Sequence, residues 1–116
     1  MLNQVTHFHI EEAYRGAALL ETHAGGLYLS KFAVGTQARG EGLAQELWEA
    51  AIRPVPAVFW RSRADNPINH WYEKQADGRH HEGCWQVFWR GVKIGDIPGI
   101  VRYCLGRPAD FIDSAD

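Results

Sequence analysis

One segment, from Leu27 to Tyr72, constrains the fold of this chain more than any other. It opens with a mostly apolar, β-prone stretch, Leu27 to Val34, which has the length of a buried strand. A glycine-bearing turn, QARGEG, follows, and the residues from Leu43 to Ile52 then repeat apolar side chains at helical spacing. The order of strand, turn and helix predicts the first half of a β–α–β unit.

The rest of the segment predicts a second strand and a second helix. Pro54 and Pro56 prevent the first helix from continuing. Residues 57–60, AVFW, form a continuous apolar run that suits a central strand buried on both faces. Asn66 followed by Pro67 is a good helix start, because it combines a capping side chain with a proline at the first helical position.

The turn between the first strand and the first helix is a candidate phosphate site. A helix N-terminus presents unpaired backbone N–H groups and the positive end of the helix dipole. Gly40 and Gly42 lack a Cβ, so a bulky anion can approach the backbone closely. The turn lacks the Gly-Lys-Ser/Thr of a P-loop and the third glycine of a dinucleotide fingerprint. A capping turn without a ligand is the alternative interpretation.

Two arginines at the end of the second strand are candidate ligands for an acidic substrate. Arg61 and Arg63 point to the same side if the strand continues through them. Guanidinium groups bind carboxylates through paired, charge-assisted hydrogen bonds. Beside a phosphate-binding turn, this pair favours an enzyme that holds an anionic acceptor.

The motifs together resemble a known family. The spacing Gln-x-x-Gly-x-Gly is similar to the pyrophosphate-binding signature of the GCN5-related N-acetyltransferases, which bind acetyl-coenzyme A. YLSKFAV, QARGEG, FWRSR and NPINHWY, in this order, resemble the acetyltransferase domain of N-acetylglutamate synthase. The resemblance is to the vertebrate-type branch, which includes bifunctional bacterial synthase/kinases, and it covers roughly residues 12 to 110.

This resemblance implies a fold and an activity. The expected fold is of the α/β (α+β) class, with a mixed, mostly antiparallel central sheet flanked by helices and a truncated N-terminal part. The activity is acetyl transfer from acetyl-coenzyme A to the α-amine of L-glutamate, the first step of arginine biosynthesis. The family places an amino-acid-kinase domain ahead of this one, and the full-length form is expected to be a homo-oligomer.

The resemblance also implies roles for individual residues. Tyr72 matches the candidate catalytic tyrosine, whose hydroxyl would protonate the departing thiolate, and Asn66 would hold the amine or orient the acyl group. The glutamate-site positions are Lys31, Arg61, Arg63 and Asn66. The positions expected to bind acetyl-coenzyme A are Ala33, Val34, Gln37, Ala38, Arg39, Gly40, Glu41, Gly42, Leu43 and Ala44. A backbone N–H near Ala33 and Val34 would stabilise the developing oxyanion.

The remainder of the chain predicts simpler elements. Residues 6–22 are expected to be extended, with a hairpin turn at residues 23–26. The alternation in CWQVFWRGV, residues 84–92, predicts another strand. A last helix from about Ile97 to Leu105 is expected to be capped by Asp96 and ended by Gly106.

Composition excludes several classes of protein. A chain of 116 residues predicts one domain, residues 1–116, and its net charge of −2 disfavours binding to nucleic acid or to anionic membranes. Cys84 and Cys104, without a CxxC motif, are expected to be reduced thiols. No apolar run approaches about 18 residues, and no signal peptide or transit segment is visible. The family that the chain resembles is mitochondrial in vertebrates, so the resemblance and the missing Arg-rich transit segment together imply a bacterial cytoplasmic protein.

Several alternatives remain open from the sequence. His7 and His9, with His80, His81 and Cys84, imitate a zinc site, but the spacing places no third ligand, so no metal is expected. Tyr72 can be a core aromatic of its helix. A non-catalytic acyl-coenzyme A sensor would keep the glycine turn without needing the cations. An acetyltransferase that acts on another small amine would keep both the glycine turn and the cations.

Overall fold

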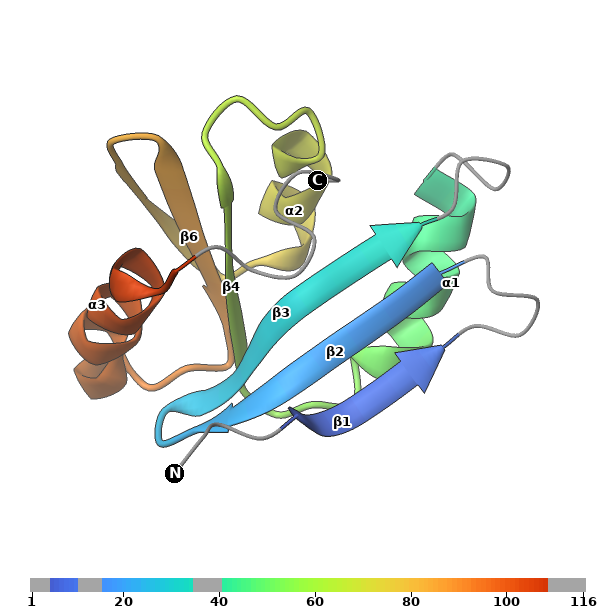
Figure 1. The fold of residues 1–116 in the computed structure, drawn as a ribbon, viewed down its shortest axis with the longest axis horizontal. Helices are drawn as coiled ribbons and strands as arrows, with labels where there is room; N and C mark the ends of the chain where they lie inside the picture. Colours follow the sequence, from blue (N-terminus) through green and yellow to red (C-terminus); the bar gives the residue numbers. More distant parts are fainter. Residues whose placement is uncertain (1–4, 11–15, 35–40, 109–116) are drawn as a thin grey trace.

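The computed structural model describes residues 5–10, 16–34 and 41–108. They form a six-stranded sheet with helices on both faces (Figure 1). The strands are β1 (Val5–Ile10), β2 (Gly16–His23), β3 (Gly26–Val34), β4 (Val58–Arg63), β5 (Gly78–Glu82) and β6 (Trp85–Arg90). The helices are α1 (Glu41–Ala51), α2 (Asn69–Gln75) and α3 (Ile97–Gly106), and a short 3-10 turn, η3 (Ile94–Asp96), leads into α3.

The sheet is mixed and mostly antiparallel. Its strand order is β1-β2-β3-β4-β6-β5, and only β3 and β4 run parallel to one another. Their connection passes through α1, as the sequence predicts for a β–α–β unit. Strand β4 lies between β3 and β6, and its first residues are buried on both faces. The expected α/β class with a mixed, mostly antiparallel sheet is therefore confirmed.

The hairpin between β2 and β3 fixes where the two halves of the sheet meet. His23 is the register partner of Gly26, so the turn contains two residues, close to the predicted position. Gly26 has a φ of 146°, and a Cβ there would lie 2.8 Å from the carbonyl oxygen of Ala57. A side chain at this position would therefore block the close approach that lets the N–H of Leu27 donate to that oxygen at 2.9 Å.

One face of the sheet, here called the α1/α2 face, carries the larger core. Trp48 of α1 is 1% exposed and packs at near right angles against Trp60 of β4, Trp71 of α2 and Phe32 of β3, with ring centroids 5.1, 5.3 and 5.4 Å apart. Edge-to-face packing of this kind adds to the stabilisation from burial. The apolar helical spacing of Leu43 to Ile52 therefore predicted the buried side of α1 correctly.

The opposite face, here called the α3 face, is covered by the last helix. Ile100 and Cys104 of α3 pack on Tyr28, Phe59 and Val87 of three neighbouring strands, and all five are fully buried. His23 closes this cluster at one end, with its ring 4.4 Å from that of Tyr103. Burial lowers the pKa of the His23 imidazole, and the carboxylate of Asp96 partly opposes this shift.

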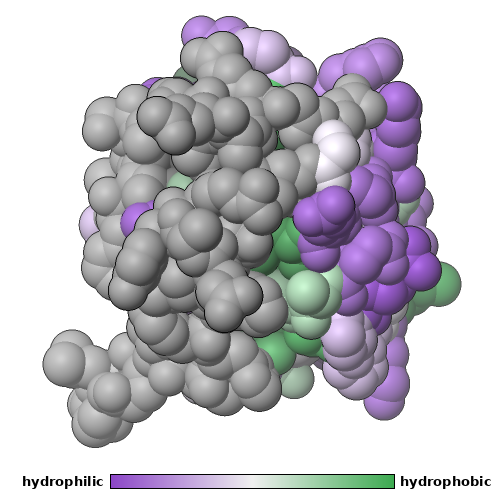
Figure 2. Space-filling view, turned by 90° about the vertical axis from the view of Figure 1, so that its right-hand side faces the viewer, coloured by the Kyte–Doolittle hydropathy of each residue, from purple (hydrophilic) through white to green (hydrophobic). Residues whose placement is uncertain are grey.

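The outer surface of α1 is polar. Glu46 and Glu49 are exposed there, and Glu49 accepts hydrogen bonds from Gln45 and Arg53 at 2.7 and 2.9 Å. Figure 2 looks at this side of the molecule and shows hydrophilic residues gathered over much of its described part. The helix is thus amphipathic, with its apolar side on the sheet.

Three local expectations need correction. Helix α2 begins at Asn69 and not at Pro67, because residues 67 and 68 form a turn. Asp96 precedes α3 but makes no capping hydrogen bond with its side chain, since η3 already runs into the helix. The sequence reading also missed β5, whose five residues include four that are exposed and polar, so they give no hydrophobic alternation.

Candidate active site

The parallel strands β3 and β4 part soon after they meet. They are paired only at Leu27 with Val58 and at Tyr28 with Phe59. Beyond this point β4 stays paired with β6 as far as Arg63, whereas β3 follows β2 in another direction, as Figure 1 shows. Among the described residues, no strand therefore lies beside the edge of β3 from Leu29 onward. A strand edge of this kind presents backbone N–H and C=O groups with which an extended ligand can pair.

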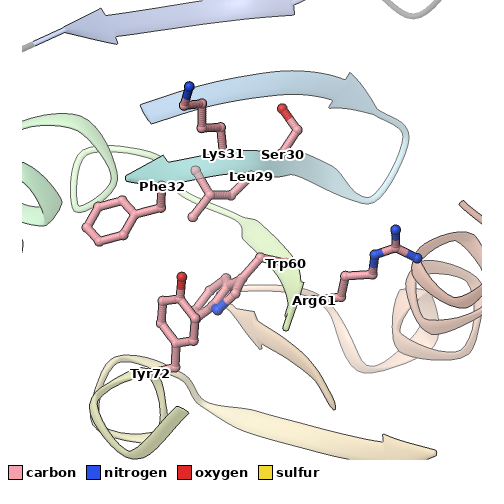
Figure 3. A pocket seen from close by; sticks show the side chains of 7 residues that line it. All are labelled: Leu29, Ser30, Lys31, Phe32, Trp60, Arg61 and Tyr72. Carbon is pink, nitrogen blue, oxygen red and sulfur yellow. The ribbon is translucent and has the colours of Figure 1, made fainter. Parts of the chain in front are cut away.

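A β-bulge at Ser30 lies beside this gap. Leu29 is opposite Leu20 and Lys31 is opposite Leu19, so Ser30 is an extra residue in β3. The bulge reverses the alternation of side chains along the strand. Leu29 and Phe32 consequently both belong to the core of the α1/α2 face, and Lys31 points the other way (Figure 3).

The same register shows which backbone groups face the gap. Leu27 donates its N–H to β4, so its main-chain groups point away from β2. In an antiparallel pair this orientation alternates along the strand. The partners of Leu27, Phe32 and Val34 in β2 are Thr22, Ala18 and Gly16, which are separated by even numbers of residues. Phe32 and Val34 therefore also point their main-chain groups away from β2, towards the gap. The N–H of Val34 is thus on the side where an oxyanion was predicted to be stabilised.

A shallow, solvent-open hollow lies where the strands part. Figure 3 shows the hydroxyl of Tyr72 pointing from α2 towards β3, between Phe32 and Trp60. The residues lining the hollow are Leu29, Ser30, Lys31, Phe32, Trp60, Arg61 and Tyr72. Three predicted site residues, Lys31, Arg61 and Tyr72, are therefore brought together around one opening.

Tyr72 combines a buried ring with a hydroxyl at the opening. Its side chain is 7% exposed, and its ring lies 5.4 Å from Trp60 and 5.5 Å from Phe88. The ring is thus part of the core, as the alternative interpretation of this residue supposed. Packing of the ring fixes the direction of the hydroxyl, so the structural and functional interpretations are compatible.

Arg61 and Arg63 share one side of β4, as the sequence predicted. The guanidinium carbon of Arg61 lies 3.9 Å from the centre of the Trp85 ring, and that of Arg63 lies 5.0 Å from it. Trp85 is the register partner of Arg63 on β6. Both arginines therefore lie on the α3 face, as does Val87 two residues beyond Trp85.

The two arginines differ in environment. Arg63 is exposed, whereas Arg61 is 8% exposed and donates to the carbonyl oxygens of Cys104, Arg107 and Pro108 at 2.9, 3.1 and 2.6 Å. In Figure 3 the guanidinium of Arg61 points away from Tyr72 towards α3. In this arrangement Arg61 holds the C-terminal end of α3. Its predicted role in binding glutamate stays a prediction.

Asn66 has a local role in the structure. Its side-chain oxygen accepts a hydrogen bond from the N–H of Ile68 at 3.1 Å, so it stabilises the turn before α2. Its side-chain nitrogen is not used in that bond. Asn69, which the sequence reading did not single out, is 6% exposed and donates to the carbonyl oxygens of Arg63 and Ala64 at 2.7 and 3.3 Å. It ties the end of β4 to α2.

Part of the predicted acetyl-coenzyme A site lies outside the described residues, namely Gln37, Ala38, Arg39 and Gly40. Gly42 stands in the first turn of α1, is exposed, and has no atom within 4 Å of the position of a Cβ. Ala44 is buried in the core of the α1/α2 face, so its side chain supports the helix. Ala33 pairs with Ala17 on β2. For Val34, Glu41 and Leu43 the main chain alone is described.

The sequence reading missed two features of this site. The bulge at Ser30 has no composition signal, because one extra residue in a strand is visible only against its partner strand. The contact of Trp85 with both arginines was hidden because tryptophan in an alternating strand usually predicts a core position. In the described part of the chain, no three His, Cys, Asp or Glu side chains form a group that could hold a metal ion.

The described residues form a mixed α/β domain in which a parallel strand pair, connected through α1, parts after two paired positions. Comparison with family models then identifies the chain. Residues 1–105 match the family described as NAT, the N-acetyltransferase of N-acetylglutamate synthase, and the chain belongs to this family. The predicted family and the class of amino-acid N-acetyltransferase are thus confirmed.

Curated relatives agree with the family model. The mitochondrial N-acetylglutamate synthases of Mus musculus and Homo sapiens are 40% and 41% identical over 92% and 89% of this chain. A protein of Xylella fastidiosa named acetylglutamate kinase is 36% identical over 90% of it. The matched regions make up 21%, 20% and 25% of these relatives, so the chain spans about a fifth to a quarter of their length.

Arginine biosynthesis and acetyl transfer to glutamate are supported at the level of the family. Among the described residues, no helix has the length and apolar character needed to cross a membrane.

Proposed function

We propose that this domain transfers the acetyl group of acetyl-coenzyme A to the α-amine of L-glutamate. The observation that carries the proposal is the parting of β3 from β4, because a thioester in the gap is reached from both faces of the sheet. The hydroxyl of Tyr72 approaches from the α1/α2 face. Arg63 and Lys31 lie on the side from which an anionic acceptor would approach.

The donor site is proposed to use backbone groups. The N-terminus of α1 follows the end of β3, and the N–H groups of a helix N-terminus suit the pyrophosphate of coenzyme A. The edge of β3 beside which no described strand lies suits the amides of the pantetheine arm, which can form hydrogen bonds with it as a neighbouring strand would. These contacts lead the thioester along the gap towards Tyr72.

The acceptor site is proposed to use side-chain cations. Glutamate has two carboxylates, and Arg63 and Lys31 offer a guanidinium and an ammonium on the α3 face. The amine attacks the thioester carbonyl, a C–N bond forms, and the amine loses a proton to water. The N–H of Val34 stabilises the oxyanion. The C–S bond then breaks, and Tyr72 donates its proton to the departing thiolate.

The full-length protein is proposed to contain a second domain. The matched region of the Xylella fastidiosa relative is a quarter of a longer chain named acetylglutamate kinase. This supports the proposal of an amino-acid-kinase-like partner domain. Homo-oligomer formation and a bacterial cytoplasmic location stay predictions.

Acceptor specificity tests the proposed function directly. We expect the wild-type protein to release coenzyme A with glutamate far faster than with glutamine, which is similar in shape but lacks the second carboxylate. Arg63→Ala should raise the KM for glutamate about ten- to a hundredfold, the equivalent of a lost charge-assisted hydrogen bond. Its KM for acetyl-coenzyme A should change little. A thiol-detection assay across the amino acids measures both, and equal rates with glutamate and glutamine would contradict the proposal.

The donor site makes a separate prediction at Gly42. A Cβ at this position meets no atom within 4 Å, so Gly42→Val should fold normally. Its side chain would stand in the first turn of α1, where the pyrophosphate is proposed to bind. We expect acetyl-coenzyme A affinity to fall tenfold or more, about 1.4 kcal/mol, by calorimetry. Gly99→Val, in the first turn of α3, has equally open surroundings and is the control, so it should bind as the wild type does. Unchanged affinity in Gly42→Val would remove this helix from the donor site.

A further inference from the structure

The half-buried ring of Trp85 contacts both the buried Arg61 and the exposed Arg63. It is the register partner of Arg63, and the guanidinium carbons of Arg61 and Arg63 lie 3.9 and 5.0 Å from its centre. We propose that Trp85 is a specificity-determining residue, which positions Arg63 to bind the side-chain or α-carboxylate of the acceptor. The inference rests on the proposed function and adds a residue to it.

The orientation of the Trp85 ring is itself restricted by its contact with Arg61. Arg61 stacks on the ring, and the carbonyl oxygens of Cys104, Arg107 and Pro108 accept hydrogen bonds from its guanidinium. Those contacts fix the plane of the Arg61 guanidinium, because its donors form a rigid fork. A fixed guanidinium against one part of the indole limits the rotation of the ring. The C-terminal end of α3 therefore stabilises the orientation of Trp85 through Arg61.

Contact with an aromatic ring restricts Arg63 more than it would restrict a buried side chain. It is exposed at the end of β4, and a long, solvent-exposed side chain loses rotamer freedom when it binds a ligand. Contact with an indole restricts the guanidinium before the ligand arrives, and cation–π attraction favours that position. Pre-organisation lowers the entropy cost of binding the carboxylate, and so it acts on affinity for the acceptor.

The contacts of Trp85 with the two arginines also favour an acidic acceptor. Arg61 and Arg63 both contact one ring, so two positive charges are kept on the same small area of the α3 face. Lys31, across the gap, points to the same side of the sheet beyond the bulge (Figure 3). A ligand with two carboxylates can pair with cations on both sides of the gap, whereas a ligand with one carboxylate leaves one side without a partner.

The test compares Trp85 with another tryptophan of the same strand. Trp89 lies on the same side of β6, is also half-buried, and packs against the core of the α3 face. No guanidinium of the described residues contacts its ring in the way that Arg61 and Arg63 contact Trp85. Trp85→Leu and Trp89→Leu therefore remove equal side chains, and only the first removes the support of Arg63.

We expect Trp85→Leu to raise the KM for glutamate about tenfold and to reduce the preference for glutamate over glutamine by a similar factor. The kcat and the KM for acetyl-coenzyme A should stay near those of the wild type. Trp85→Phe retains an aromatic face and should recover most of the loss. Trp89→Leu should lower the melting temperature without changing the preference. If Trp85→Leu does not fold, Trp85→Met, which keeps apolar volume without a ring, takes its place.

Two results would overturn the inference. One is a Trp85→Leu or Trp85→Met protein that prefers glutamate as strongly as the wild type. The other is a Trp89→Leu protein that loses the preference to the same extent, since the effect would then come from general loosening of β6. Failure of the wild-type protein to acetylate glutamate is a different outcome, because it contradicts the proposed function itself.

Discussion

Tyr72→Phe is expected to lower the rate of acetyl transfer about a hundredfold or more, within the usual range for loss of a general acid. The ring of Tyr72 is buried among Trp60, Phe88 and other aromatic side chains, and phenylalanine preserves that packing. Only the hydroxyl that points into the gap is deleted. Because proton donation to the thiolate occurs in the transition state, kcat and kcat/KM should fall together. Steady-state kinetics with both substrates measures this.

Tyr103→Phe is a matched control for the loss of a hydroxyl. The hydroxyl of Tyr103 accepts a hydrogen bond from Arg107 at 2.7 Å on the α3 face, away from Tyr72. Its removal should lower stability by about 1 kcal/mol and leave the turnover rate unchanged. A Tyr72→Phe protein that behaves in this way, with lower stability and normal turnover, would show that Tyr72 is a core residue only.

Much of the framework around Tyr72 was predictable from local patterns. Apolar spacing predicted the buried side of α1, and the glycine turn at residues 23–26 predicted the hairpin before β3. The continuous apolar run at residues 57–60 predicted a central strand. Each of these signals depends on residues near one another in the chain, and burial on the sheet reinforces each of them.

The gap itself was not predictable from local patterns. The point where β3 and β4 part depends on pairing between residues about thirty positions apart, namely Tyr28 and Phe59. The bulge at Ser30 depends on the register of β2, and it decides the side to which Lys31 points. The motif resemblance supplied Lys31 as a site residue without indicating its direction. Sequence spacing alone would have placed it by strict alternation on the wrong face.

Arg61 shows how a correct geometric expectation can leave the role open. Its position beside Arg63 on one side of β4 follows from strand alternation, and the structure confirms it through their common contact with Trp85. The sequence gives no sign that the end of α3, more than forty residues later, folds back onto it. The motif predicts that Arg61 binds a substrate carboxylate, whereas in the structure its guanidinium donates to main-chain carbonyl oxygens. Stability measurements separate these two roles.

Arg61→Ala is expected to lower the free energy of unfolding by about 3 kcal/mol or more, because the oxygens it leaves are partly buried and lose charge-assisted hydrogen bonds. For a domain of this size the melting temperature should fall by roughly 10 °C. Three carbonyl groups at the end of α3 lose their donor, and Trp85 loses the guanidinium that stacks on it. Denaturant unfolding followed by circular dichroism gives the free energy directly.

Two further variants show which property of Arg61 matters. Arg61→Lys keeps the charge, but one ammonium on a flexible stem lacks the planar fork that reaches three carbonyl groups and stacks on an indole. It should recover less than half of the lost stability. Arg63→Ala removes an exposed guanidinium from the same side of β4, so its free energy of unfolding should stay within about 0.5 kcal/mol of the wild type. If Arg61→Ala were instead as stable as Arg63→Ala, with a similar rise in the KM for glutamate, Arg61 would be a second substrate ligand. The end of α3 would then have to be held by other contacts.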